Sequence, residues 1–257
     1  MLDQITPLIL TLNESANISR TLSRLGWARE VVVVDSFSTD DTLAKVAAFP
    51  NARVVQRAFD YHAAQWNFGL LETGITTPWV LALDADFMLT DAARDEIAAL
   101  RPEADTGGYE AGFRYCIEGR ALRGAAYPPV TVLYRREGAR YEQDGHTQRI
   151  GHRGSRRRLA QPLLHDDRKN LGQWIAAQSR YMRLEAEKLL GQRDALGWAD
   201  RLRRTRVLGP PAMLCYCLII RGGILEGRAG WYYAFQRTAA EMLLSLYLLE
   251  HDLKNKR

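Results

Sequence analysis

Cysteine is scarce in this chain of 257 residues, which holds only Cys116, Cys215 and Cys217. An odd number, with two of the three in a Cys-x-Cys pair, provides neither a disulfide framework nor a zinc-ligand spacing. We therefore expect a reducing compartment. A basic segment before the first apolar run is also missing, since Asp3 is the only charged residue there. The start of the chain is thus expected to form a strand and not a signal peptide.

Phosphate-binding glycine motifs and long apolar runs are absent too. No G-x-G-x-x-G follows the first strand and no G-x-x-x-x-G-K-[ST] occurs, which argues against nicotinamide dehydrogenases and P-loop NTPases. A membrane span needs roughly 20 apolar residues. The segment Val207–Ile220 lacks charge for 14 residues but contains Pro210-Pro211, and Ala229–Leu249 includes Arg237 and Glu241. Neither segment is expected to cross a membrane.

The composition is that of a folded protein with an uneven charge. Apolar residues make up 47% and charged residues 25%, which excludes disordered, collagenous and disulfide-scaffold classes. Residues 1–100 carry 7 Lys and Arg against 13 Asp and Glu, or −6, and residues 101–257 carry 28 against 17, or +11, giving the net +5. A basic second half indicates an anionic partner such as phosphate, nucleic acid or a membrane face.

The first hundred residues alternate strand and helix patterns. We expect strands at Leu8–Leu12, Glu30–Asp35, Ala52–Gln56 and Trp79–Leu83, and helices from Asn13, over Thr42–Ala48 and Ala63–Leu71, and from Thr90 to Leu100. Such a βαβαβαβ order predicts an α/β fold with a mainly parallel sheet and right-handed crossovers. Beyond Gly108, the strand-like segments Tyr109–Ile117 and Val130–Arg135 predict an added antiparallel section.

The last third of the chain is predicted to be helical. A long helix is expected from Asn170 through Leu190, followed by an arginine-rich stretch and the two apolar segments. The aromatic residues Trp231, Tyr232, Tyr233 and Tyr247 beside basic residues are typical of a helix in a membrane interface. A helical hairpin packed on the sheet, or in a dimer interface, is the alternative. We therefore divide the chain into a domain of residues 1–170 and a helical, membrane-surface region of residues 171–257.

Carboxylates follow the predicted strands of the first half. Asp35 ends the second strand, and Asp84 and Asp86 follow the fourth. In an open α/β sheet, ligands bind beyond the carboxyl ends of strands. Neighbouring carboxylates repel each other unless a cation lies beside them, and hard oxygen ligands suit Mg²⁺ or Mn²⁺ together with substrate phosphates. The alternative is a set of acids that favour the following helix N-terminus.

Four ordered blocks resemble one known family. The blocks are Leu10–Glu14, Val32–Thr42, Gln65–Gly69 and Trp79–Asp86, and their order and spacing are similar to those of family 2 glycosyltransferases of GT-A fold. A second set resembles the branch that adds sugars to the lipopolysaccharide core, the glucosyltransferase-like enzymes. It comprises His165–Arg168, Arg180-Tyr181, Glu185-Ala186 and Gly222–Gly227.

The resemblance implies roles for individual residues. Nucleotide-sugar contacts are implied for Thr11, Asn13, Glu14, Asp35, Ser38, Asn67 and Asp84, with Asp35 at the base and Asp84 at ribose or sugar. Asp86 is implied to hold the metal ion, and His165 resembles the later histidine that completes its coordination. A surface histidine beside Asp166 and Asp167 is the alternative for His165.

The chain departs from the family pattern at three places. A serine, Ser36, follows Asp35 where a second acid is common, and Phe87 stands where the core-sugar branch often has glutamate. The branch's His-Glu of the acceptor region is also missing, which leaves the catalytic base open. Asp144 is our first choice for this base, with His146 and Glu142 as alternatives, or all three are solvated loop residues.

Together these observations predict an inverting glycosyltransferase. It would move a sugar from a nucleotide donor, expected to be UDP-linked, to a lipopolysaccharide core or another lipid-linked glycan, with Mg²⁺ or Mn²⁺. We expect a cytoplasmic protein held peripherally at the inner face of the cell membrane, with no nucleic-acid partner and with homodimerisation left open. The alternative is a non-catalytic nucleotide-sugar or nucleic-acid binding module, for which arginine-rich segments such as Arg149–Arg158 are the motive.

Overall fold

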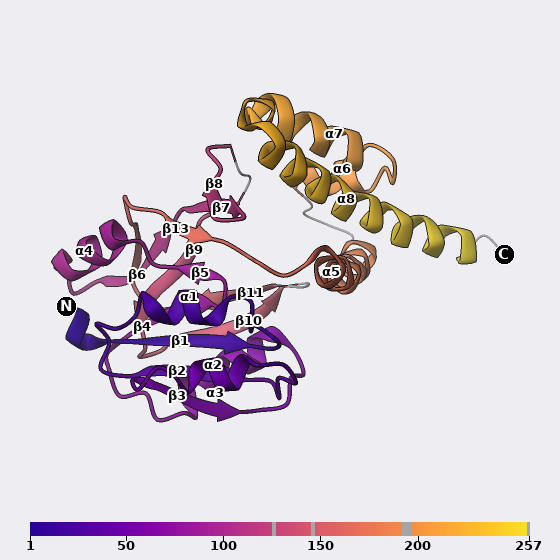
Figure 1. The fold of residues 1–257 in the computed structure, drawn as a ribbon. Coiled ribbons are helices and arrows are strands. Elements are labelled where there is room, and N and C mark those ends of the chain that lie inside the picture. Colours follow the sequence, from indigo (N-terminus) through magenta and orange to yellow (C-terminus); the bar gives the residue numbers. More distant parts are fainter. Residues whose placement is uncertain (125–126, 145–146, 192–196, 256–257) are drawn as a thin grey trace. The chain divides into compact units, whose positions relative to one another are not determined.

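The computed structural model describes residues 1–124, 127–144, 147–191 and 197–255, and it divides into two compact units (Figure 1). Unit 1 comprises Met1–Ala121 and Tyr127–Lys169, and unit 2 comprises Leu122–Ala126 and Asn170–Arg257. Every strand of the described residues belongs to unit 1, and the long C-terminal helices belong to unit 2.

Unit 1 is built on a seven-stranded sheet in the order β12-β6-β9-β4-β1-β2-β3. These strands are β1 (Ile5–Thr11), β2 (Val31–Asp35), β3 (Ala52–Gln56), β4 (Trp79–Asp84), β6 (Thr106–Ala111), β9 (Val130–Arg135) and β12 (Ser155–Arg158). All neighbours are parallel except β9, which is antiparallel to both β4 and β6. The mainly parallel α/β sheet predicted from the sequence is confirmed, as is an antiparallel addition.

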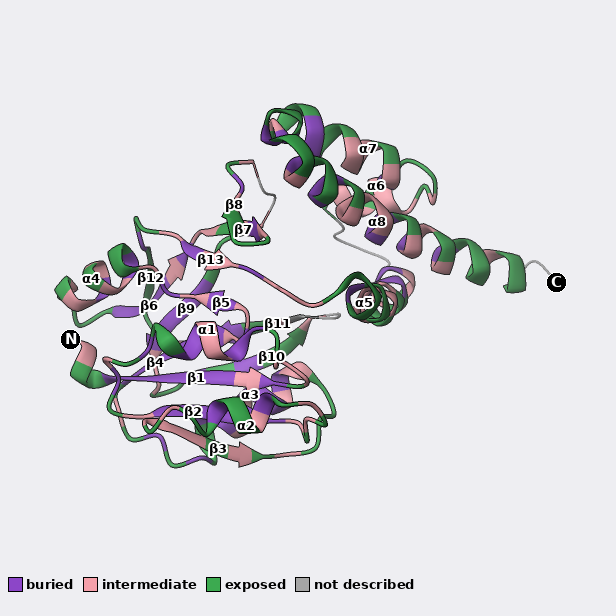
Figure 2. Cartoon of the chain, in the orientation of Figure 1, coloured by how far each residue is buried: buried purple, intermediate pink, exposed green. Residues whose placement is uncertain are grey.

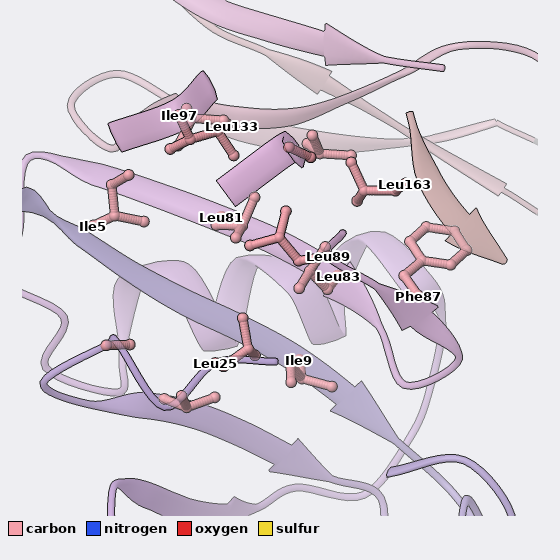
Figure 3. Close-up of a cluster of buried hydrophobic side chains, with 14 of the residues drawn as sticks. Ile5, Ile9, Leu25, Leu81, Leu83, Phe87, Leu89, Ile97, Leu133 and Leu163 are labelled. Atoms are coloured by element: carbon pink, nitrogen blue, oxygen red, sulfur yellow. The ribbon is translucent and has the colours of Figure 1, made fainter. Parts of the chain in front are cut away.

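Alternating side chains of the central strands supply a core on each face of the sheet. Ile9, Val33 and Leu83 belong to one core, which α1 (Ile18–Ser23) and α4 (Asp91–Ala99) cover (Figure 3). Leu8 and Val34 belong to the other, beneath α3 (His62–Leu71). The run of valines in β2 is completely buried, as expected for a strand covered on both faces.

The loops after β1 and β2 are joined by side-chain hydrogen bonds. The backbone N–H groups of Asn13, Glu14 and Ser15 donate to Ser38 Oγ, Thr42 Oγ1 and Asp40 Oδ2, at 2.8, 2.8 and 3.1 Å. Asn13 itself has a left-handed φ of 56°. Helix α1 therefore begins at Ile18, later than the sequence predicts, because the preceding N–H groups donate hydrogen bonds to side chains of the loop after β2. Helix α2 (Thr42–Val46) follows that loop.

Two smaller sheets complete unit 1. The segment predicted as one strand, Tyr109–Ile117, is divided at Gly112 into β6 and β7 (Phe113–Ile117), which belong to different sheets. The remaining strands are β5 (Phe87–Met88), β8 (Arg120–Ala121), β10 (Arg140–Asp144), β11 (Thr147–Gly151) and β13 (Leu163–His165). Strand β13 lies between β5 and β7, and β10 pairs with β11 as a hairpin.

Unit 2 is helical where it is described. Its helices are α5 (Leu171–Gly191), α6 (Trp198–Arg203), α7 (Gly209–Cys215) and α8 (Gly227–Asn255), with a π-helical turn at Tyr216–Ile220 and a 3-10 turn at Gly223–Glu226. Ala186 and Leu189 of α5 pack on Leu244 and Leu248 of α8. No helix within the described residues is long and apolar enough to span a bilayer.

Candidate active site

The order of the strands places a ligand-binding edge between β1 and β4. The chain runs outward from β1 to β2 and β3, and then returns to β4 on the other side of β1. Such a reversal opens a crevice at the carboxyl ends of the two strands. Leu10 of β1 lies opposite Asp84 of β4, and Thr11 lies opposite Asp35 of β2. The carboxylates predicted from the sequence therefore meet at this edge.

Asp84, Asp86 and His165 form the centre of the site. His165 Nε2 lies 3.0 Å from Asp86 Oδ2, and the two side chains are 15% and 14% exposed. Burial and the Asp86 charge raise the pKa of Asp84. Burial opposes the charged form of His165, yet Asp86 and Asp84 together raise its pKa above the ordinary value. The surface-histidine alternative is wrong, because His165 is largely enclosed.

Aromatic rings enclose His165. Strand β13 places it beside Phe87 of β5 and Tyr115 of β7. Edge-to-face packing brings the rings of Phe87, Tyr115 and Tyr127 within 5.1, 4.7 and 4.9 Å of the imidazole, centroid to centroid. Within the described part of the chain, His165 Nδ1 is buried without a hydrogen-bond partner. The ring thus presents Nε2 to the acids, and Phe87 packs where the resemblance suggested a glutamate.

A lysine that the sequence analysis did not single out is also part of the site. Lys169 Nζ lies 2.5 Å from Glu14 Oε1, and Asn17 Nδ2 donates to both Glu14 Oε2 and Asp167 Oδ1 at 2.9 Å. Burial and the Asp86 charge raise the pKa of Glu14, although Lys169 opposes them. The network ties the loop after β1 to the segment that follows His165.

Asp166 anchors that segment and is only 1% exposed. Its carboxylate receives Arg20 Nη1 at 2.6 Å and Arg168 Nε at 2.9 Å, and its own N–H donates to Asp86 O at 3.0 Å. Two guanidinium groups and a backbone bond therefore hold the chain between His165 and Lys169 in place.

Replacing Asp166 by alanine should lower the free energy of unfolding by about 3–5 kcal/mol, because two partly buried arginines lose their shared counter-ion. The matched control is Glu118→Ala. Glu118 binds the same Arg168 at 3.1 Å but is 80% exposed, so its loss should cost less than about 1 kcal/mol. Urea unfolding of the two variants measures both values. Equal small losses would contradict an anchoring role for Asp166.

Asp35 and its neighbours organise the loops of the predicted nucleotide pocket. Asp35 is fully buried and accepts hydrogen bonds from Thr11 Oγ1, Ser38 N, Ser38 Oγ and Gln56 Nε2. Asn13 Oδ1 accepts from Thr39 N at 2.8 Å. In this arrangement Thr11 and Ser38 both donate hydrogen bonds to Asp35. Their predicted contacts with a nucleotide remain a prediction.

Asn67 and Asp144 are both associated with the β10–β11 hairpin. The Asn67 amide donates to Tyr141 O at 2.9 Å and accepts from Tyr141 N at 2.8 Å, which clamps β10 onto α3. Glu142 and Asp144 lie two residues apart on β10, so they share the face of the strand opposite to that of Tyr141. Asp144 Oδ2 pairs with Arg149 Nε at 2.6 Å. His146, an alternative base, lies outside the described residues.

The acids at this edge suit a divalent cation that is shared with a substrate. Among the described residues, no group of three or more His, Cys, Asp or Glu side chains is arranged to hold a metal ion. Mg²⁺ and Mn²⁺, however, are commonly held by one or two carboxylates and substrate phosphates. Burial first, and the neighbouring Asp86 charge second, raise the pKa of Asp84, and a cation at this edge would favour the charged form of both carboxylates. The residues present therefore fit such an ion, and the assignment of Asp86 and His165 as its ligands stays a prediction.

Comparison with known families and proteins matches this chain to glycosyltransferases. A family model described as glycosyl transferase family 2 matches residues 8–161. A lipopolysaccharide core biosynthesis glycosyltransferase of Rhizobium meliloti, LpsC, is 27% identical over 260 residues, covering 91% of this chain and 90% of that protein. An uncharacterised glycosyltransferase of Rickettsia conorii is 38% identical over 96 residues. That match covers 37% of this chain. This chain spans only about a third (33%) of the length of the Rickettsia protein.

Two solved structures share the fold. The S. aureus TarS structure of residues 1–349 with UDP-GlcNAc has a TM-score of 0.51 at 13% identity, covering 97% of this chain and 92% of that one. Glucosyl-3-phosphoglycerate synthase of M. tuberculosis, in complex with phosphoglyceric acid, has a TM-score of 0.50 at 18% identity, covering 74% and 81%. Their similarity confirms the GT-A fold expected from the sequence.

Proposed function

The chain belongs to glycosyl transferase family 2, and from this premise we propose that it is an inverting enzyme that transfers a sugar from a UDP-linked donor to a lipopolysaccharide core or another lipid-linked glycan. The observation that carries the proposal is the placement of Asp84, Asp86 and His165 at the carboxyl edge between β1 and β4. The full-length similarity to LpsC supports the acceptor class.

The donor side of the proposed site is formed by the loops after β1, β2 and β4. We assign Asp35 to the nucleobase, with Asn13 and Ser38, which are hydrogen-bonded to each other, in the adjoining loops, and Asp84 to a ribose or sugar hydroxyl. Asp86 and His165 would hold Mg²⁺ or Mn²⁺, and the chemistry that such an ion supplies is neutralisation of charge on the leaving diphosphate. The enclosing rings of Phe87, Tyr115 and Tyr127 keep water from the other side of His165.

The acceptor side is assigned to the β10–β11 hairpin. In an inverting transfer, the acceptor oxygen attacks the anomeric carbon as the bond to the diphosphate breaks, and a base takes the hydroxyl proton. We assign this role to Asp144, the last described residue of β10. Arg149 holds the Asp144 carboxylate at the end of the hairpin. Asn67 and Tyr141 fix the strand on which Asp144 lies.

Lys169 is proposed to bind the donor diphosphate. It is surrounded by Glu14, Asp86 and Asp167, whose charges raise its pKa against the effect of burial, so it stays a cation. Replacing Lys169 by methionine should weaken UDP binding by about tenfold and leave uridine binding unchanged, since uridine lacks phosphate. Calorimetric titration of both ligands gives the two affinities.

The matched control for this prediction is Lys45→Met. Lys45 Nζ donates to Ser15 O of the same loop at 2.6 Å, but its side chain is exposed. This variant should bind UDP and uridine as the unchanged protein does. Equal weakening of UDP and uridine in Lys169→Met would indicate a role in the shape of the loop and would contradict a diphosphate contact.

A donor-hydrolysis assay tests the proposed function as a whole. UDP-glucose, UDP-GlcNAc and other UDP-sugars are incubated with the protein and Mn²⁺, and released UDP is measured. Slow release from one donor, together with a raised melting temperature in its presence, is expected. Oligonucleotide binding that weakens with salt, without any UDP release, would instead favour a nucleic-acid binding module.

Peripheral attachment to the inner face of the cell membrane is the second part of the proposal. It rests on the apolar and aromatic residues that unit 2 leaves exposed, among them Trp231 and Tyr232. At that surface the enzyme would bind its lipid-linked acceptor. Homodimerisation through unit 2 is the alternative use of the same residues.

A further inference from the structure

Helix α8 has exposed residues along its length (Figure 2), and some of the exposed apolar ones form a stripe. The stripe comprises Trp231, Phe235, Met242, Leu246, Leu249 and Leu253, which are 36% to 69% exposed. At 3.6 residues per turn, these side chains fall within about 60° of one another around the helix axis. Buried residues such as Tyr233, Leu244 and Leu248 lie on another side and pack within unit 2. The stripe is therefore not needed to hold the helices of unit 2 together.

A second group of exposed apolar side chains lies in the turn that leads into α8. This group, which we call the apex, comprises Ile219, Ile220, Ile224 and Leu225, and its members are 54% to 87% exposed. Glycines fix the turn. Gly222 has a left-handed φ of 69°, and a Cβ on Gly230 would lie 1.9 Å from Gly223 O. The glycines thus define the conformation of the turn, and the apex presents aliphatic side chains to solvent.

Exposed charges near the apex and along the stripe as far as Leu249 are basic, whereas beyond Leu249 the exposed Glu250 pairs with Lys254 at 2.6 Å. The only acids between Tyr216 and Leu249 are Glu226 and Glu241, and both are buried. Glu226 Oε1 accepts Arg123 N at 2.8 Å, and Glu241 Oε1 pairs with Arg203 Nη2 at 2.6 Å. Arg221 and Arg228, by contrast, are exposed. From Tyr216 to Leu249 this apolar surface is flanked by exposed arginines and by no exposed acid, which complements an anionic lipid surface.

We propose that the apex and the α8 stripe form one lipid-binding face, which lies in the interfacial layer of an anionic bilayer. Because the stripe runs the length of α8, the helix lies parallel to the membrane plane, with Arg221 and Arg228 at the level of the phosphates. This inference rests on the peripheral attachment proposed above and adds the residues and the orientation. Pairing two copies of the face in parallel would instead bring arginines together without an acidic partner.

Vesicle binding by the full chain tests the face. Phosphatidylcholine vesicles with and without phosphatidylglycerol are sedimented with the protein at low and high salt. The unchanged protein should bind the anionic vesicles, and less strongly in high salt. Leu246→Asp in the stripe and Leu225→Asp in the apex should each weaken binding by about tenfold or more. The matched control Leu71→Asp replaces an exposed leucine at the end of α3 in unit 1 and should leave binding unchanged.

The outcomes separate this inference from the proposed enzyme activity. UDP release from a donor without acceptor is measured for every variant, and unchanged release in Leu246→Asp shows an intact unit 1. Vesicle binding that neither leucine variant weakens would overturn the assigned face. The proposal would be overturned if the protein does not bind vesicles and light scattering shows a dimer that Leu246→Asp dissociates. The stripe would then contact a second copy of the chain.

Discussion

Asp86→Ala should lower sugar-transfer turnover by about three orders of magnitude or more, because the carboxylate that would hold the metal ion is lost. The fold should persist. Removing Asp86 costs the 3.0 Å contact with His165 but removes the negative charge that, together with burial, raises the pKa of Asp84. The melting temperature is therefore expected to change by no more than a few degrees, about 1 kcal/mol in stability.

The matched control for this variant is Asp95→Ala. Asp95 lies on α4, pairs with Arg94 at 2.8 Å, and is exposed, so its loss should leave turnover and melting temperature nearly unchanged. Turnover is measured as UDP release with the best donor in the presence of Mn²⁺. Normal turnover in Asp86→Ala, with the fold intact, would refute a metal bridge through this carboxylate.

Asp144→Asn is expected to lower turnover by about 10²–10⁴-fold, the usual effect of removing a general base. The substitution keeps the size of the side chain and removes its charge. Donor affinity should hardly change, since the nucleobase and diphosphate of the donor are assigned to the loops after β1, β2 and β4 and to Lys169, and not to the hairpin. Asparagine also loses the ion pair with Arg149, so the effect of that pair has to be measured separately.

Three companion variants complete this test. Arg149→Gln removes the ion pair but keeps the Asp144 carboxylate, and it should cost much less turnover than Asp144→Asn. Glu142→Gln and His146→Ala examine the alternative bases. Normal turnover in Asp144→Asn with collapse in one of these two would assign the base to that residue. Equal loss of donor affinity in all of them would place the hairpin at the donor site.

The sequence was sufficient for most of unit 1. The valine run of β2 and the acids after β4 are local patterns, and they correctly predicted a parallel sheet with carboxylates at one edge. The helix expected from Thr90 is present as α4, and Thr90 Oγ1 caps it by accepting a hydrogen bond from Ala93 N. Such features are readable because each depends on a few consecutive residues.

Other parts of the site could not be read from the sequence because they depend on long-range pairing. Lys169 reaches Glu14 only because β13, in the smaller sheet, returns the chain beside β5, which follows β4. Tyr115 and Tyr127 meet His165 through pairing of β13 with β7 and through a connecting loop. No spacing in the sequence marks these contacts. The run of charges after His165 was the one available signal, and it does not reveal which acid is buried.

The calorimetric titration of UDP into the protein, with Mn²⁺ and again with a chelator, tests the central claim most directly. The claim is that the edge formed by Asp84, Asp86 and His165 binds a nucleotide diphosphate through a divalent cation. We expect UDP to bind in Mn²⁺ and to lose most of its affinity in the chelator, and Asp86→Ala to bind equally weakly in both. UDP affinity that is the same with and without Mn²⁺, or that Asp86→Ala leaves intact, would contradict the claim.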